Sequence, residues 1–358
     1  MTECSEKDLS FALDAIQNPK IRESEEFKIW INKEENRTLF IELMAGKEAV
    51  MREKHLKKAV LKKRTGIISL ISAAAAITIF AVFLPELFRQ PSQYQTKENI
   101  QFFTANTSLD EVVLEVENKS TEIIKDSFIA MNCPDKKCKK NADIEYQTVR
   151  TPRGKDFHII LSDGTEVWLN TESSLRFPNH FTGKERRVIL KGEAFFNVAH
   201  NKKYPFIVCT EGIDTKVLGT KFNVCSYNKE QRHVTLVEGK VEVNNNKSKE
   251  SSILSPGQNI TYDSEDKAQI NEVNTAVYTA WTEGMFYFED KPLKEIMNTI
   301  GRWYNVDIFF ENEDLYNITL NFWASRNSSV SDAIALLNDL GKVKIQITEN
   351  NEIIVKQK

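Results

Sequence analysis

The sequence predicts a multidomain membrane protein: a small all-α inner domain, a single transmembrane helix, an all-β outer domain that is solenoid-like or sandwich-like, and then a small α+β domain. Three observations predict this fold class. An uncharged apolar run, residues 65–84, directly follows the basic stretch 52–64. From about Ile100 the hydrophobic pattern changes from helical to alternating. Beyond Met285, strand-like and helical segments alternate.

Residues 1–64 are predicted to be a helical cytoplasmic segment. Apolar residues recur at helical spacing, and several are large aromatic side chains. A unit of this size buries too small a core to be very stable alone, so a partner could complete its surface, although ordinary packing of a small helical bundle explains the same pattern. The apolar residues that would contact such a partner are Leu9, Leu13, Ile16, Phe27, Trp30, Leu39 and Leu43.

Residues 65–85 are predicted to form the transmembrane helix. Twenty uncharged residues, at about 1.5 Å each, span the roughly 30 Å hydrocarbon core of a bilayer. Seven of the 13 residues in 52–64 are basic, whereas 85–105 contains only Arg89 and Lys97. Basic residues are retained on the cytoplasmic side, so the N-terminus is expected inside and the C-terminus outside. A buried helix of a soluble protein is the alternative.

The part beyond the predicted span divides into three segments. Residues 86–149 are predicted to be a linker with a β insertion, and 150–265 an all-β domain, because short β-branched or aromatic runs such as 157–161 and 194–198 alternate with Gly-rich or Asn-rich turns. Residues 278–358 are predicted to be a small α+β domain, with amphipathic helices at 292–304 and 331–340 between strands.

Four cysteines follow the predicted span, and an oxidising compartment would allow them to form disulfides. Their spacing leaves three connectivities open. No second Cys or His stands at metal-binding spacing, so disulfides are favoured over a metal site. The disulfide candidates are Cys133, Cys138, Cys209 and Cys225.

Composition and motifs argue against several classes of protein. A net charge of −3 gives no indication of direct nucleic-acid binding. The five histidines are scattered without metal spacing, and the sequence contains no GxSxG, HExxH or phosphate-binding loop. We therefore expect neither an enzyme, nor a cofactor, nor a bound metal.

Several multi-residue blocks follow one another in the outer part. They are 151–154 (TPRG), 161–170 (LSDGTEVWLN), 187–198 (RVILKGEAFFNV), 217–224 (VLGTKFNV), 235–239 (TLVEG) and 254–258 (LSPGQ). In this order and spacing they closely resemble the periplasmic region of FecR-family anti-sigma factors. The tail from Trp281 is similar to the C-terminal domain of the polysaccharide-utilisation branch of that family.

The resemblance implies a signal relay across the inner membrane. The inner helices would bind an extracytoplasmic-function (ECF) sigma factor through the apolar residues given above. The periplasmic domains would detect a TonB-dependent outer-membrane transducer through its signalling domain. Because similar modules bind by strand addition, the expected contact strands are 286–288 and 317–323, with Phe286, Phe288, Leu320 and Phe322 as the transducer-binding candidates.

The dipeptide Gly219-Thr220 is a candidate for self-cleavage, because FecR-like proteins resemble one another there. A Thr hydroxyl can attack the preceding carbonyl in an N-to-O acyl shift and give an ester that hydrolyses. In the alternative interpretation, Gly219 makes a tight turn and Thr220 begins a strand.

Two other classes of function stay open at this stage. A membrane-tethered glycan-binding or envelope scaffold protein without a sigma partner would share the same topology. Sequons such as those at Asn106, Asn118, Asn259, Asn317 and Asn327 suggest a eukaryotic type II glycoprotein, but such sequons arise often by chance in an Asn-rich chain.

Overall fold

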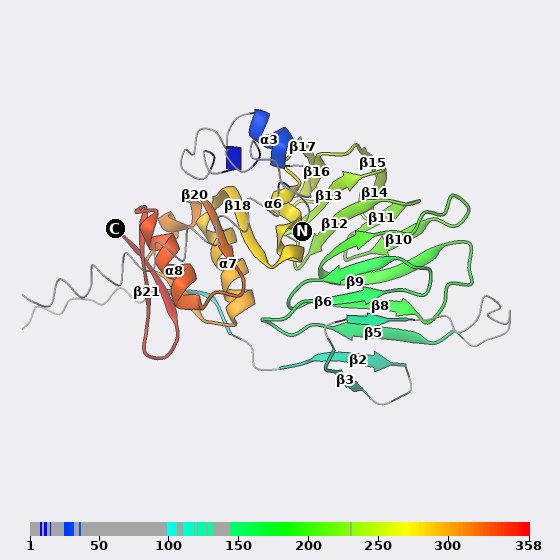
Figure 1. Ribbon diagram of the computed structural model, residues 1–358, viewed down its shortest axis with the longest axis horizontal. Coiled ribbons are helices and arrows are strands. Elements are labelled where there is room, and N and C mark those ends of the chain that lie inside the picture. The colour runs from blue at the N-terminus through cyan, green and yellow to red at the C-terminus, as the bar shows by residue number, and fades with distance from the viewer. Residues whose placement is uncertain are drawn as a thin grey trace, which may run out of the picture. The chain divides into compact units, whose positions relative to one another are not determined.

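The computed structural model describes residues 99–105, 110–117, 119, 121–126, 128–131, 144–229 and 231–358, together with residues 8, 11, 12, 15, 25–31 and 36. The chain divides into two compact units, residues 1–98 and 99–358. In Figure 1 the second unit is coloured from cyan at its start through green and yellow to red at its C-terminus.

The described part of the first unit contains the helix α3 (Glu25–Ile31) and a small aromatic cluster. Phe27 is buried, and its ring centroid lies 5.8 Å from that of Trp30. The indole Nε1 of Trp30 donates a hydrogen bond of 2.7 Å to Asp8 Oδ1. These contacts hold α3 against the residues that precede it in the chain.

The predicted fold class is wrong for the part of the chain that the structure describes, which is mostly β structure. Among these residues, no helix combines the length and the apolar character that membrane crossing requires. The longest described helix, α7 (Leu293–Tyr304), has 12 residues, which is about 18 Å. A small all-α inner domain is not seen among the described residues either, where α3 is the one helix before residue 99 with defined bounds. The predicted transmembrane residues 65–85 lie outside the described residues.

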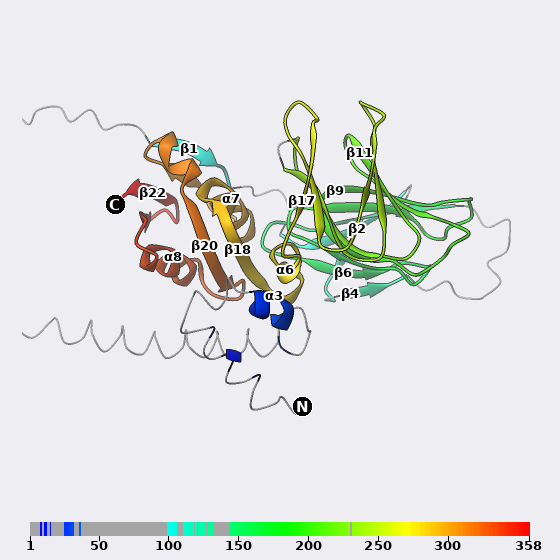
Figure 2. The same cartoon turned by 90° about the horizontal axis from the view of Figure 1, so that it is seen from above.

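Most of the second unit is a sandwich of two β-sheets (Figures 1 and 2). The first sheet has the order β3-β2-β5-β8-β9-β10-β11-β14-β15 and the second the order β4-β6-β7-β9-β12-β13-β16-β17. The first sheet comprises β2 (Val112–Val116), β3 (Glu122–Ile124), β5 (Tyr146–Arg150), β8 (Ser174–Pro178), β9 (Arg186–Asn197), β10 (Phe206–Cys209), β11 (Ile213–Val217), β14 (Val241–Asn245) and β15 (Ser251–Leu254). The second adds β4 (Phe128–Ala130), β6 (Phe157–Ile160), β7 (Glu166–Leu169), β12 (Lys221–Ser226), β13 (Arg232–Glu238), β16 (Gln258–Tyr262) and β17 (Ala268–Glu272).

Strand β9 belongs to both sheets. Its first half pairs with β8 and β10, and its second half with β7 and β12. Gly192 lies between the two halves with a φ of +97°, a conformation that residues with a side chain rarely adopt. A Cβ at this position would lie only 2.7 Å from Ser173 Cβ. Glycine therefore allows the strand to pass from one sheet to the other without ending.

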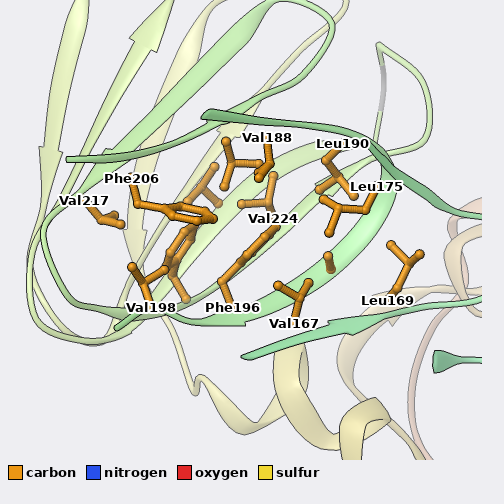
Figure 3. Packing of buried hydrophobic residues seen from close by; sticks show 14 of the residues in the cluster. Val167, Leu169, Leu175, Val188, Leu190, Phe196, Val198, Phe206, Val217 and Val224 are labelled. Carbon is orange, nitrogen blue, oxygen red and sulfur yellow. The ribbon is translucent and has the colours of Figure 1, made fainter. Parts of the chain in front are cut away.

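The core of the sandwich lies between the two sheets, where alternate side chains of each strand point inward (Figure 3). Phe206 comes from the first sheet, and Phe196 and Phe222 from the second; all three are fully buried. The rings of Phe196 and Phe222 stack at 5.2 Å. Each such side chain contributes about 1.5–3 kcal/mol to folding by leaving water. The opposite face of β12, which carries Asn223, lies outside this core.

The rest of the unit is a smaller α+β domain with its own core. One sheet has the order β1-β19-β22-β21, and β18 and β20 form a separate pair. Strand β1 pairs antiparallel with β19, although about 200 residues separate them in sequence. The elements are β1 (Ile100–Phe103), β18 (Met285–Pro292), α7, β19 (Ile308–Phe310), η2 (Glu313–Asn317), β20 (Thr319–Ser325), α8 (Val330–Asp339), β21 (Val343–Ile347) and β22 (Ile353–Gln357). The short helices α6 (Ala276–Thr279) and η1 (Ala280–Glu283) connect this domain to the sandwich.

Candidate functional site

Gly219 and Thr220 lie in the tight connection between β11 and β12. A Cβ on Gly219 would lie 2.7 Å from the Cα of His200, so only glycine fits this close approach of two backbone segments. Thr220 is buried, and its hydroxyl donates a hydrogen bond of 3.1 Å to the carbonyl oxygen of Lys240. A neutral carbonyl is a weak proton acceptor, so this arrangement fits the interpretation as a turn; self-cleavage stays a prediction.

The cysteine candidates are separated by the fold. Cys209 lies on β10 in the first sheet and Cys225 on β12 in the second, and both are free cysteines. The Cys209 sulfur accepts a hydrogen bond from Arg187, whereas the Cys225 thiol donates to the Gln231 carbonyl oxygen at 3.4 Å. The structure therefore contains no disulfide between these two candidates, which was one of the pairings left open by the sequence. Cys133 and Cys138 lie outside the described residues.

Two of the sigma-binding candidates are described. Phe27 is buried in the aromatic cluster and Trp30 is half-buried at its edge. The remaining candidates lie outside the described residues. These are Leu9, Leu13, Ile16, Leu39 and Leu43.

The transducer-binding candidates lie on the paired strands β18 and β20, but they point into the domain. Phe286, Leu320 and Phe322 are buried, and Phe288 packs against the same core. These four side chains are therefore not a contact surface in this conformation. The outward positions on β20 are Thr319 and Asn321, both exposed. A partner that approached this strand would meet those side chains first.

The most unusual polar site is the junction between the sandwich and the α+β domain. Arg326, which follows β20, is only 4% exposed, and its guanidinium donates a hydrogen bond of 2.9 Å to Asn170 Oδ1. Asn170 in turn donates to a carboxylate oxygen of Glu193 at 2.7 Å, and Asn223 donates to the other oxygen at 2.9 Å. The indole N–H of Trp281, in η1, donates a further hydrogen bond to Asn223 Oδ1. Polar groups from both domains thus form one buried network.

A second charged group lies beside this network. The carboxylate of Glu172 accepts hydrogen bonds from Arg153 of the sandwich at 2.6 Å and from Arg302 of α7 at 2.9 Å. The Arg302 guanidinium lies 3.9 Å from the ring centroid of Tyr227, a geometry typical of cation–π attraction. Glu172 therefore joins one arginine from each domain.

Strand β1 is held by residues of both domains as well. Arg153 donates to the carbonyl oxygen of Thr104 at 2.6 Å and lies 4.5 Å from the ring centroid of Phe103. On the other side, the backbone N–H of Ala105 donates to Asp307. The segment that leads from the first unit is thereby attached at the junction.

Burial dominates the protonation equilibria in the junction. Burial raises the pKa of Glu193, and the hydrogen bonds from Asn223 and Asn170 offset this in part. Burial also raises the pKa of Tyr227 and lowers the pKa of His233 to about 3, so the phenol and the imidazole are both neutral near pH 7. Tyr227 and His233 therefore add no charge to the junction at that pH.

No local sequence pattern predicts this junction. Arg302 and Arg326 were placed on or beside predicted elements of the second domain, and nothing in a local pattern says that they would be buried. Glu172 has a φ of +53°, which is uncommon outside glycine, but this is visible only in the structure. The one available signal was the charged and polar character of the TES and WLN segments around residues 168–173.

The fold and the junction together define a class of two-domain module, in which hydrogen bonds from buried arginine side chains link a β sandwich to a small α+β domain. Residues 147–242 match the family described as FecR protein, and residues 285–355 match the family described as FecR, C-terminal. The chain is a member of the FecR family, which confirms the resemblance inferred from the sequence blocks.

Two solved structures are similar to this chain. Both are of a candidate anti-sigma factor from Parabacteroides distasonis ATCC 8503, at 2.50 and 1.65 Å resolution. The first is 27% identical and covers 60% of this chain and 99% of that chain; the second is 28% identical and covers 59% and 99%. The TM-score is 0.54 for each. No curated protein matches the chain.

Proposed function

We propose that this protein is an anti-sigma factor that sequesters an ECF sigma factor and releases it in response to a TonB-dependent outer-membrane transducer. The observation that carries the proposal is the presence of both FecR family domains, in order, in one chain. The similarity to the P. distasonis candidate anti-sigma factor over most of that protein's length supports it.

The proposed location is the inner membrane, with the N-terminus in the cytoplasm and the C-terminus in the periplasm. Support comes from the basic stretch 52–64 followed by the uncharged residues 65–84. Labelling of single introduced cysteines in intact cells tests it. Reagents that cannot enter the cytoplasm should modify an exposed position of the sandwich and leave a position near residue 30 unmodified; equal labelling of both contradicts the topology.

The buried junction supports a relay between the two periplasmic domains. A partner that shifts the α+β domain has to break or rearrange the Arg302–Glu172 and Arg326–Asn170 contacts, because these hydrogen bonds run from that domain to the sandwich. Such linkage is what coupling between two distant sites requires. The signal would thus reach β1, which Arg153 holds at the same place.

Co-purification of the full-length chain with the ECF sigma factor encoded beside it tests the sigma-binding role. We expect a stoichiometric complex, and we expect deletion of the gene to raise transcription from promoters of that sigma factor. The variant Trp30→Ala should weaken the complex, whereas Lys344→Ala, an exposed change on β21, should leave it intact. A chain that binds no sigma factor would instead favour an envelope scaffold.

The transducer contact is tested on the outward side of β20. The double variant Thr319→Lys and Asn321→Lys should abolish induction without lowering the amount of protein, because both side chains are exposed. The matched control is Gln346→Lys on the outward side of β21. Normal induction in the β20 double variant would show that a different surface binds the transducer.

Immunoblotting tests self-cleavage at Gly219-Thr220. An N-to-O acyl shift needs a hydroxyl at residue 220, so fragments should form in the wild type and in Thr220→Ser but be absent in Thr220→Ala. A single full-length band in all three proteins would leave the turn as the sole role of the dipeptide.

A further inference from the structure

Three side chains beside the junction bring together the donor types of a metal centre. Glu193 on β9, Cys225 on β12 and His233 on β13 occupy opposed positions, since Cys225 is in register with Glu193 on one side and with His233 on the other. Opposed residues on adjacent strands have Cβ atoms about 4.5–5.5 Å apart, so the three side chains stand in a row on one face. One ligand atom of each lies within 4.8 Å of those of the other two.

This face of the second sheet points away from the sandwich core. Phe222 and Val224 are members of the core cluster, so the intervening Asn223 and the following Cys225 point to the opposite side. There the connecting segment covers them: Trp281 donates to Asn223, and the Tyr278 ring meets His233 edge-on with centroids 5.2 Å apart. The row of donors therefore lies beneath α6 and η1.

Among the three donors, His233 has a buried nitrogen without a hydrogen-bond partner in the described part of the chain, whereas the Cys225 thiol donates to the Gln231 carbonyl oxygen and the Glu193 carboxylate accepts from two amides. Cys225 is 5% exposed and carries a free thiol. His233 Nε2 is fully covered and has no hydrogen-bond partner among the described residues. A buried polar atom in this state is uncommon in native proteins and calls for an explanation such as an ion or a water molecule.

We propose that Glu193, Cys225 and His233 bind a zinc ion. Zinc takes thiolate, imidazole and carboxylate ligands, and three protein ligands leave a fourth tetrahedral position for water. Binding replaces the thiol S–H bond of Cys225 by a sulfur–zinc bond and releases that proton to solvent. The two amides that donate to Glu193, from Asn170 and Asn223, orient the carboxylate and leave it lone pairs for the metal.

The charge of the site fits its surroundings. The cations that act on these donors are Arg302, Arg326 and Lys291. A zinc ion with one thiolate and one carboxylate has no net charge, so the loaded site as a whole does not repel these three cations. The bound ion would join three strands directly under the segment that connects the two domains.

Titration of the purified, metal-free full-length chain with Co²⁺, followed by displacement with Zn²⁺, tests the proposal. We expect one Co²⁺ per chain, with a thiolate-to-cobalt charge-transfer band in the near ultraviolet that Zn²⁺ removes. Cys225→Ser should lose the band. Cys209→Ser, which alters the free thiol of the other sheet, should keep it and is the matched control. His233→Gln should weaken Zn²⁺ binding by more than the roughly 10–100-fold that loss of an outer partner of a ligand costs.

A thiolate band that persists in Cys225→Ser, or a wild-type chain that binds no stoichiometric metal, would overturn the site. Should Cys225→Ser fail to fold by circular dichroism, His233→Gln decides: a folded variant with wild-type Zn²⁺ affinity also overturns it. None of these results depends on a sigma factor or transducer, so the metal site and the proposed function can fail separately.

Discussion

Replacement of Arg326 by methionine tests the energetic importance of the junction. Methionine keeps much of the bulk of the side chain but removes its charge and its hydrogen bond to Asn170. A hydrogen bond from a charged group contributes about 1.5–3 kcal/mol. The guanidinium also lies 4.7 Å from the Trp303 ring centroid and 5.2 Å from that of Phe286, which adds about 0.5–2 kcal/mol. We therefore expect Arg326→Met to lower the free energy of unfolding by about 2–5 kcal/mol.

Urea unfolding followed by tryptophan fluorescence is the appropriate assay, because Trp281 and Trp303 both face Arg326. With a slope of about 1–3 kcal/mol per molar urea, the midpoint should fall by about 1 M or more. The matched control is Arg150→Met, since Arg150 forms an exposed pair with Glu115 that contributes only about 0.2–1 kcal/mol. Equal shifts in the two variants would refute the argument that the junction stabilises the domain pair.

Two further predictions concern the sandwich. Gly192→Ala should destabilise the protein by more than about 1 kcal/mol, because a positive φ disfavours any side chain and the added Cβ would overlap its neighbour. The control is Gly257→Ala, which has the same backbone strain but open space around the added Cβ. Thermal melting of both variants separates the cost of backbone strain from the cost of overlap. Hydrogen bonds from Lys247 and Arg232 hold the pKa of Asp266 at about 2, below its ordinary value of 3.8. The stabilisation is therefore present above pH 4 and is lost as pH falls towards 2. Asp266→Asn should show a weaker decline of the urea midpoint across that window, and an unchanged decline would contradict the assignment.

The local hydrophobic pattern was sufficient to predict many of the strands and both longer helices of the α+β domain. The run 157–161 contains β6 (Phe157–Ile160), and the predicted helix 292–304 is α7 with one residue removed from its start. Apolar and polar residues alternate along such strands because one face of each strand is buried, and this alternation can be recognised in the sequence. The run 194–198 was predicted as a short strand, yet residues 194–197 are the end of the 12-residue strand β9. A glycine in a strand pattern usually marks the end of the strand, whereas Gly192 marks the point where β9 passes from one sheet to the other.

Pairing between distant segments was not predictable from pattern. Residues 86–149 were predicted as a linker and insertion, but Ile100–Phe103 forms the edge strand β1 of the C-terminal sheet. Periodicity says that a segment is extended and which face is apolar; it does not say which strand will be its neighbour. The packing of Phe102 on Phe310, with ring centroids 5.0 Å apart, could be known only from the folded sheet that β1 and β19 share.

The same limit explains why the polar site was missed while the core was found. A core residue is recognised from its own strand, because burial repeats every second position. A residue such as Glu172 depends on arginines that are 19 positions before it and 130 positions after it. Its importance arises only when the two domains bring these charges together and cover most of both arginines, since a fully exposed ion pair of the same kind would contribute little. In this protein the charges that matter are therefore those which the fold buries at the boundary between domains, and the register of β9, β12 and β13 places the three proposed zinc ligands at that same boundary.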